Sequence, residues 1–146
     1  MDRWLALLDE LLARPFPAGA DRAEQPAPHH IDLRVSQDFY DDETRDETIG
    51  PLYAEFQAER DRLAHAISLR YGPAQQKDLQ PYFDSEPPPS EPGSALFSYL
   101  SEWFFEVDLW KLGDRGIVVE VGHQDKELPL QLMLVVGDLS SGPVTS

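Results

Sequence analysis

The chain has 146 residues, of which 27 are acidic and 12 are basic, so its formal net charge is −15 at pH 7. A strongly negative protein repels phosphate backbones and anionic lipid surfaces, which argues against nucleic acid and membranes as partners. The absence of cysteine excludes disulfides, thiolate metal sites and cysteine nucleophiles. Solubility, or attraction of a basic protein partner, remains as the reason for the charge.

The length and composition fit one globular domain. With 41% hydrophobic residues the chain can bury a core, so we expect residues 1–146 to form a single α+β domain. Its predicted architecture is an antiparallel meander of three, possibly four, strands with a long helix and an N-terminal helix packed on one face. No run approaches the roughly 20 apolar residues that span a bilayer. The first 14 residues lack the basic start and small-residue cleavage site of a signal peptide, so the sequence predicts a cytoplasmic location.

The N-terminal segment has the apolar spacing of a helix. Residues 3–14 form this helix in our prediction, with Asp2 as its cap and Pro15 as its end. Because a helix this short is marginal alone, it must pack on other elements, with Trp4 in the core. Residues 15–30 are rich in Pro, Ala and Gly and are expected to form a loop.

Residues 29–35 alternate between apolar and polar side chains. Ile31, Leu33 and Val35 would then lie on the same side of a strand. The run is short, so the pattern indicates either a fourth strand of the sheet or an extended loop.

Residues 38–47 are the densest acidic run in the chain, and Asp41, Asp42 and Glu43 lie at its centre. One interpretation is a solvated loop that leads into a helix, where the helix dipole favours negative charge. The other is a docking surface for a basic partner. The sequence leaves both open.

Residues 51–71 have the length and spacing of a long helix. Pro51 suits the first helical position, and Gly72 followed by Pro73 suits the end. The predicted buried stripe consists of Leu52, Phe56, Leu63, Ile67 and Tyr71. Residues 57–62 interrupt this stripe with charge, so we expect Arg60 and Arg62 on the outer face.

Two further segments are rich in turn-forming residues. Residues 75–93 contain five prolines and are expected to form a loop. Ser94 could cap a short helix that ends at Leu100 and packs under the sheet. Residues 138–146 read as a frayed tail.

Residues 103–137 carry the clearest pattern, which predicts three consecutive antiparallel strands. The turn between the first two strands is expected at residues 113–116, with Gly116 in the left-handed conformation. The second strand would cover residues 117–121. The third would begin near Leu128, opposite Val121, with Pro129 at its start.

A type I turn followed by a left-handed glycine would leave an odd number of unpaired residues between the two strands, and that number determines which side chains share a face. In that register Phe105, Val107 and Leu109 lie on the buried side, together with Ile117, Val119, Val121 and the leucines of the third strand. The opposite face would present Trp110, Val118 and Met133 among acids. We expect this patch to be covered by another segment, by a partner or by a second copy of the chain.

The four histidines provide little evidence for chemistry. Adjacent His29 and His30 would point apart, and no spacing places two metal ligands on one helix face, so no metal site or cofactor is predicted. No serine has a nucleophile-elbow sequence, and no glycine-rich phosphate loop is present, so no catalytic residue is assigned. His123 and Asp125 lie in a predicted hairpin tip that could bind a partner.

The leading hypothesis is a non-enzymatic acidic module, such as an immunity or inhibitor-type protein or a chaperone, that engages a basic protein. The predicted contact residues are Asp41, Asp42, Glu43, Glu106, Asp108, Trp110, Glu120, His123 and Asp125. The alternative is a small enzyme or ligand-binding domain with a pocket between helix and sheet that uses His29, His30 or His123. A homodimer through the second sheet face is a third possibility.

Overall fold

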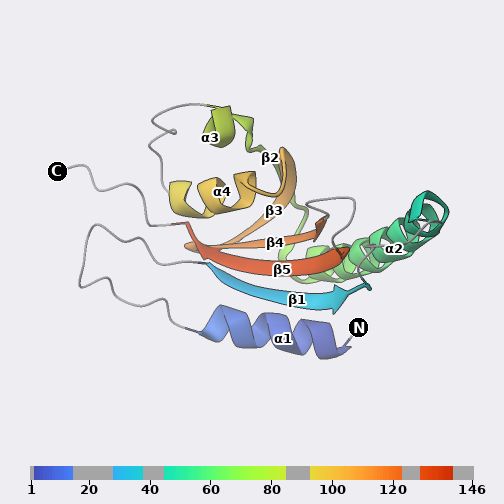
Figure 1. Ribbon diagram of the computed structural model, residues 1–146. Coiled ribbons are helices and arrows are strands. Elements are labelled where there is room, and N and C mark those ends of the chain that lie inside the picture. The colour runs from blue at the N-terminus through green and yellow to red at the C-terminus, as the bar shows by residue number, and fades with distance from the viewer. Residues whose placement is uncertain (1, 15–27, 38–44, 85–92, 123–128, 140–146) are drawn as a thin grey trace.

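The computed structural model describes residues 2–14, 28–37, 45–84, 93–122 and 129–139, and this part of the chain has an α+β fold (Figure 1). Five strands form one antiparallel sheet in the order β1-β5-β4-β3-β2. The elements in chain order are α1 (Asp2–Ala13), β1 (His29–Val35), α2 (Arg45–Tyr71), β2 (Gln75–Asp78), α3 (Gln80–Asp84), α4 (Ser94–Ser101), β3 (Glu106–Leu112), β4 (Arg115–Gly122) and β5 (Gln131–Asp138).

Helices cover both faces of this sheet (Figure 1). The N-terminal helix α1 and the long helix α2 pack on one face, as the sequence predicts, and bury Leu8, Leu11, Phe56, Leu63 and Ile67 there. Helices α3 and α4 pack on the other face through Tyr82, Leu96, Phe97 and Leu100, together with Leu79 just before α3. The central strands are therefore buried on both sides, which explains why β5 is apolar at almost every position.

Helix α2 begins six residues earlier than expected. Pro51 was predicted as the first helical residue, but the helix starts at Arg45 and Pro51 lies inside it. An internal proline removes one backbone hydrogen bond. The expectation was wrong because proline occurs at helix starts more often than inside helices, and the residues before it have little apolar periodicity to mark them as helical.

The turn between β3 and β4 differs from the prediction and changes the register. Leu112 pairs with Arg115, so the connection has only two residues, Gly113 and Asp114. Gly113 has the left-handed φ of 62° that such short hairpin turns require, whereas Gly116 is an ordinary strand residue. The odd loop that we expected is therefore wrong.

An even loop reverses the predicted faces of β3, because a shift of one residue exchanges the two sides of a strand. Leu109 pairs with Val118 and belongs, with Val107, to the core under α4. Trp110 pairs with Ile117 and belongs to the core under α2. Phe105, predicted to be buried, lies outside the strand and is exposed.

The hairpin of β4 and β5 keeps the predicted faces with a longer connection. Val121 pairs with Leu132 and not with Leu128. The observed partner lies four residues after the predicted one. Because four is an even number, Ile117, Val119 and Val121 still share the buried side with the leucines of β5. Pro129 precedes the strand, where its missing amide hydrogen costs no ladder bond.

Residues 29–35 form strand β1, which confirms the strand that the sequence allowed there, but the strand contains an irregularity. Its pairing with β5 shifts between Asp32 and Arg34. Beyond this bulge the side chains change sides, so Val35 is half exposed and does not follow Ile31 into the core. Arg34 instead turns to the α2 side and stacks its guanidinium 4.4 Å from the ring centre of Phe56.

The segment predicted as a loop over residues 75–93 contains two regular elements, β2 and α3, so that prediction was wrong in its first half. The four residues of β2 are all polar and have no alternation that a sequence could reveal. Helix α4 confirms the expected short helix, but its N-cap is Gly93 in the left-handed conformation, and Ser94 is the first helical residue and not the cap. Of the predicted tail, Asp138 belongs to β5 and Leu139 donates its amide to the carbonyl of Asp114 at 2.7 Å.

Close approach of α4 to the sheet depends on a glycine. A Cβ placed on Gly137 would lie 2.5 Å from Cδ1 of Leu96. Leu96 therefore occupies the space that any other residue in β5 would fill, and the α4 layer packs directly on the strand backbone.

Candidate functional site

The predicted contact residues fall into two groups. Asp41, Asp42, Glu43, His123 and Asp125 lie outside the described residues. The other four, Glu106, Asp108, Trp110 and Glu120, belong to β3 and β4. The structure brings Asp108 and Glu120 together, leaves Glu106 exposed and buries Trp110.

Asp108 and Glu120 are partners of an arginine of the same chain. Arg60 of α2 reaches Oδ2 of Asp108 at 2.5 Å and Oε1 of Glu120 at 3.3 Å. Its Nε also donates to the carbonyl of Val119 at 3.0 Å. Arg60 is therefore mostly buried against the sheet, which corrects the expectation that it lies on the outer face of α2.

Burial and charge compete in this cluster. Burial alone would lower the pKa of Arg60, but the negative charge of Glu120 and the hydrogen bonds to Asp108 and Asp61 raise it. Burial also raises the pKa of Glu120, and it outweighs the opposing attraction of Arg60. Because arginine stays protonated in either case, the carboxyl of Glu120 determines how the cluster responds to pH.

Trp110 has a structural role in this chain. It is 3% exposed, and its indole Nε1 donates to Oγ of Ser68 in α2 at 3.1 Å. Of the second-face patch, Val118 and Met133 are buried as well, and Val118 lies in the core beneath α3 and α4. The chain itself thus covers the side chains that the sequence suggested for a homodimer.

The adjacent histidines of β1 point apart, as expected for a strand. The imidazole Nε2 of His29 lies 3.3 Å from the carbonyl of Arg14. Arg115 donates to the same oxygen at 2.8 Å, and both contacts satisfy the C-terminal end of α1. The position of His29 therefore explains how α1 is attached to the sheet.

His30 belongs to a polar chain on the α4 side. Its Nδ1 lies 2.8 Å from the hydroxyl of Tyr99, and its Nε2 lies 2.9 Å from Oδ1 of Asp32. Gln131 donates to the second oxygen of Asp32 at 3.1 Å. Since a carboxylate only accepts, neutral His30 donates through Nε2 to Asp32 and accepts from the hydroxyl of Tyr99.

This Asp32–His30–Tyr99 chain resembles a catalytic triad in its connections, but its electrostatics oppose nucleophile formation. A tyrosine nucleophile or base would need a lowered pKa. Burial and the negative charges of Asp32 and Glu102 instead raise the pKa of Tyr99. The arrangement therefore favours a hydrogen-bonded link between β1, β5 and α4.

The described ranges contain neither a candidate metal-binding cluster nor a candidate membrane-spanning helix. Within them, no group of three or more His, Asp or Glu side chains is placed to hold a metal ion. In the same ranges, no helix has the length and apolar character to cross a bilayer.

A different surface combines aromatic and acidic side chains. Five exposed residues, here called the edge patch, lie where β2 pairs with β3 at the sheet edge and where α3 follows: Asp78, Phe83, Asp84, Phe105 and Glu106. Asp78 pairs with Glu106, and the amide of Leu79 donates to the carbonyl of Phe105 at 2.8 Å. Phe105 is 69% exposed and Phe83 is 63% exposed.

Sequence reasoning identified only Glu106 of this patch. Phe105 was assigned to the core because it continues the alternation of Val107 and Leu109. Phe83 and Asp78 were not considered, because residues 75–93 were predicted to form a loop. The signal that could have found them is the pair of aromatics flanked by acids on both sides of the Pro-rich segment.

Several arginines form ion pairs with acidic residues of the same chain. Arg14 pairs with Glu10, and Arg70 pairs with Asp9. Arg34 bonds both Glu55 and Glu59. With 27 acids against 12 arginines and lysines, the chain still carries a large excess of negative charge.

Comparison with protein-family models, with curated proteins and with solved structures found no match. The chemistry of the described surface is therefore the evidence that bears on function. Two features of that surface have the character of binding sites, namely the edge patch and a cavity beside α4. No histidine lines this cavity.

Proposed function

We propose that the protein is a non-enzymatic binding module for a basic protein, of the inhibitor, immunity or chaperone type, and that it binds through the edge patch. The observation that carries this proposal is the exposure of Phe83 and Phe105 among Asp78, Asp84 and Glu106. The described surface offers no other pair of exposed phenylalanines.

The two aromatic rings supply the apolar part of such an interface. Phe83 and Phe105 are more than half exposed and belong to neither of the two apolar cores that flank the sheet. Aromatic side chains dominate binding energy when a partner covers them, and polar residues around them exclude water. The composition of the edge patch thus fits a small hot spot with a charged rim.

The charge of the protein indicates the chemistry of the partner. A net charge of −15 attracts a basic protein over distances of several ångströms and accelerates its association at low salt. Asp84 follows Phe83 in the chain, Glu106 follows Phe105, and Asp78 pairs with Glu106 across the two strands. A lysine- or arginine-rich surface would therefore find both long-range attraction and short-range ion pairs here.

Site-specific photo-crosslinking tests this proposal. A benzophenone amino acid replaces Phe105 in one variant and Leu69 in a control variant. Leu69 is 76% exposed on α2, so it offers a matched apolar position at another element. In a lysate of the source cells at low salt, position 105 should capture a basic protein that position 69 does not.

The salt dependence distinguishes this result from unspecific capture. Crosslinking at position 105 should decline as the salt concentration rises, because screening weakens the attraction between the partners. Equal crosslinking from both positions, or capture of acidic proteins only, would contradict the proposal.

A further inference from the structure

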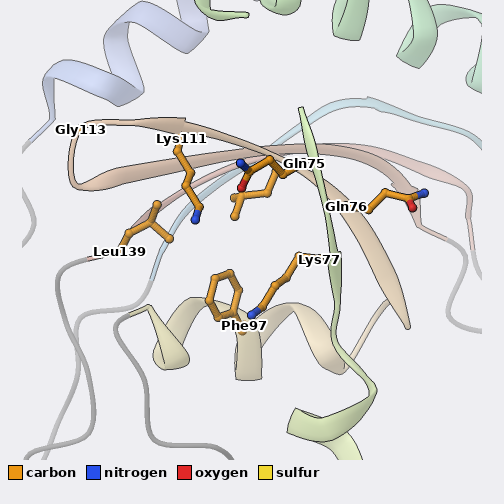
Figure 2. A pocket seen from close by; sticks show the side chains of 8 residues that line it. Gln75, Gln76, Lys77, Phe97, Lys111, Gly113 and Leu139 are labelled. Atoms are coloured by element: carbon orange, nitrogen blue, oxygen red, sulfur yellow. The ribbon is translucent and has the colours of Figure 1, made fainter. Parts of the chain in front are cut away.

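A cavity of about 300 Å³ lies on the α4 side of the sheet, at the edge formed by β2 (Figure 2). Phe97 of α4, Leu109 of β3 and Leu139 form its apolar walls. Gln75, Lys77 and Lys111 supply polar groups from β2 and β3. Its volume is at the lower end of the range for sites that bind small organic molecules.

The charge of this cavity is opposite to that of the protein. The whole sequence contains three lysines, and two of them, Lys77 and Lys111, line this one cavity. None of its lining residues is acidic. In a chain with more than twice as many acids as bases, two cations in one concave site make a locally positive environment.

The two ammonium groups are held differently. The Nζ of Lys77 lies 4.6 Å from the ring centre of Phe97, so a cation–π contact directs this side chain along the cavity wall. Figure 2 shows the side chain of Lys111 extending from β3 into the space between Leu139 and Phe97. Within the described ranges, no hydrogen bond or ion pair joins the ammonium group of Lys111 to another residue.

We propose that this cavity binds a small organic carboxylate with an apolar body. The carboxylate would accept hydrogen bonds from Lys111 and from the amide of Gln75, which points into the same space (Figure 2). The apolar body would cover Phe97, Leu109 and Leu139. This site lies apart from the edge patch and does not depend on the proposed protein partner.

The lining favours this ligand class over a bare inorganic anion. Three of the lining side chains are fully apolar, and phosphate has no apolar group to pack against the parts of them that line the cavity. Lysine also binds as a point charge, without the bidentate fork by which arginine recognises phosphate and sulfate. A ligand with one charged end and one apolar end uses both kinds of lining residue.

Calorimetric and NMR titration of the whole chain with octanoate tests the proposal. Saturable binding is expected, with amide shifts at Lys111, Phe97 and Leu139. Octanol and octylammonium carry the same chain without the negative charge and should bind at least tenfold more weakly. Inorganic phosphate should bind more weakly than octanoate as well, because it lacks the apolar body.

Charge-removing variants localise the site. Lys111→Met keeps the apolar stem at an exposed position and should weaken octanoate binding by about fivefold to tenfold. Arg62→Met removes the same charge from the exposed face of α2, on the other side of the sheet, and should leave binding unchanged. The proposal is overturned if octanol or phosphate binds as tightly as octanoate, or if both variants bind like the original protein.

Discussion

The guanidinium of Arg60 donates its Nε–H to the backbone carbonyl of Val119 at 3.0 Å. This contact lies where β3 and β4 stop pairing, because their register ends at Leu109 and Val118. The amide of Asp108 donates to the carboxylate of Glu120 at 3.3 Å in the same place. Side chains therefore satisfy backbone groups that would otherwise lack their ladder partners.

Replacement of Arg60 should be costly for this reason. Arg60→Met leaves the carboxylate of Glu120 largely buried without its cation and the carbonyl of Val119 without its donor. We expect a loss of about 2 to 4 kcal/mol in the free energy of unfolding, measured by urea denaturation. Arg62→Met, at an exposed position of the same helix, should change it by no more than about 0.5 kcal/mol. Equal effects of the two changes would show that the Arg60 cluster is not structural.

Stability should depend on pH through Glu120. Because its pKa is raised in the folded protein, the folded state holds this proton more tightly than the unfolded chain does. The resulting contribution is fully present below the ordinary pKa of about 4.5 and is lost as the pH rises through the raised pKa. Glu120→Gln removes this dependence.

Urea denaturation between about pH 4 and about pH 7 measures this effect. The free energy of unfolding of the original protein, minus that of Glu120→Gln, should fall as the pH rises. The fall should be larger in an Arg60→Met background, where the attraction that lowers the pKa of Glu120 is absent. A difference that grows with pH would mean that Arg60 outweighs burial.

The close packing of α4 on β5 predicts opposite effects of two glycine changes. Gly137→Ala places a Cβ against Leu96 and should destabilise the protein by about 1 to 3 kcal/mol. Gly50→Ala lies in an exposed turn of α2 with no atom within 4 Å of the new Cβ, so it should stabilise by up to about 1 kcal/mol. Thermal unfolding of both variants checks the prediction. A neutral Gly137→Ala would show that Leu96 can move aside.

Much of the sheet could be predicted because its central hairpin has a strict alternation. Ile117, Val119 and Val121 face the α2 core, as their spacing indicates. The register of β3 could not be predicted in the same way, because Val107 and Leu109 on one side compete with Trp110 and Leu112 on the other. Both sides are apolar since helices cover both faces, so only the turn geometry at Gly113 distinguishes the two registers.

The candidate sites could not be predicted because they depend on a β-bulge, a strand pairing and a strand boundary that the sequence does not mark. The bulge at residues 32–34 directs Arg34 toward α2, although alternation alone would place it on the opposite side. Lys77 and Lys111 are far apart in the chain and meet only because β2 pairs with β3. Phe105 was misplaced because its alternation with Val107 continues past the start of the strand.

The acids of the edge patch should control association more than the final affinity. Glu106→Gln combined with Asp84→Asn removes two exposed charges of the edge patch, one next to Phe105 in the chain and one next to Phe83. We expect the association rate with the basic partner to fall severalfold at low salt, with a smaller change in the dissociation rate. Surface plasmon resonance measures both rates. An effect confined to the dissociation rate would show that these acids do not steer the encounter.

The most direct test of the proposed function is the affinity of the partner captured by crosslinking for Phe105→Ser and for Leu69→Ser, measured by calorimetry at low and high salt. Both positions are exposed, so neither change should unfold the chain. The edge patch predicts at least tenfold weaker binding for Phe105→Ser, unchanged binding for Leu69→Ser, and weaker binding of the original protein at high salt. Equal affinities of the two variants would contradict it.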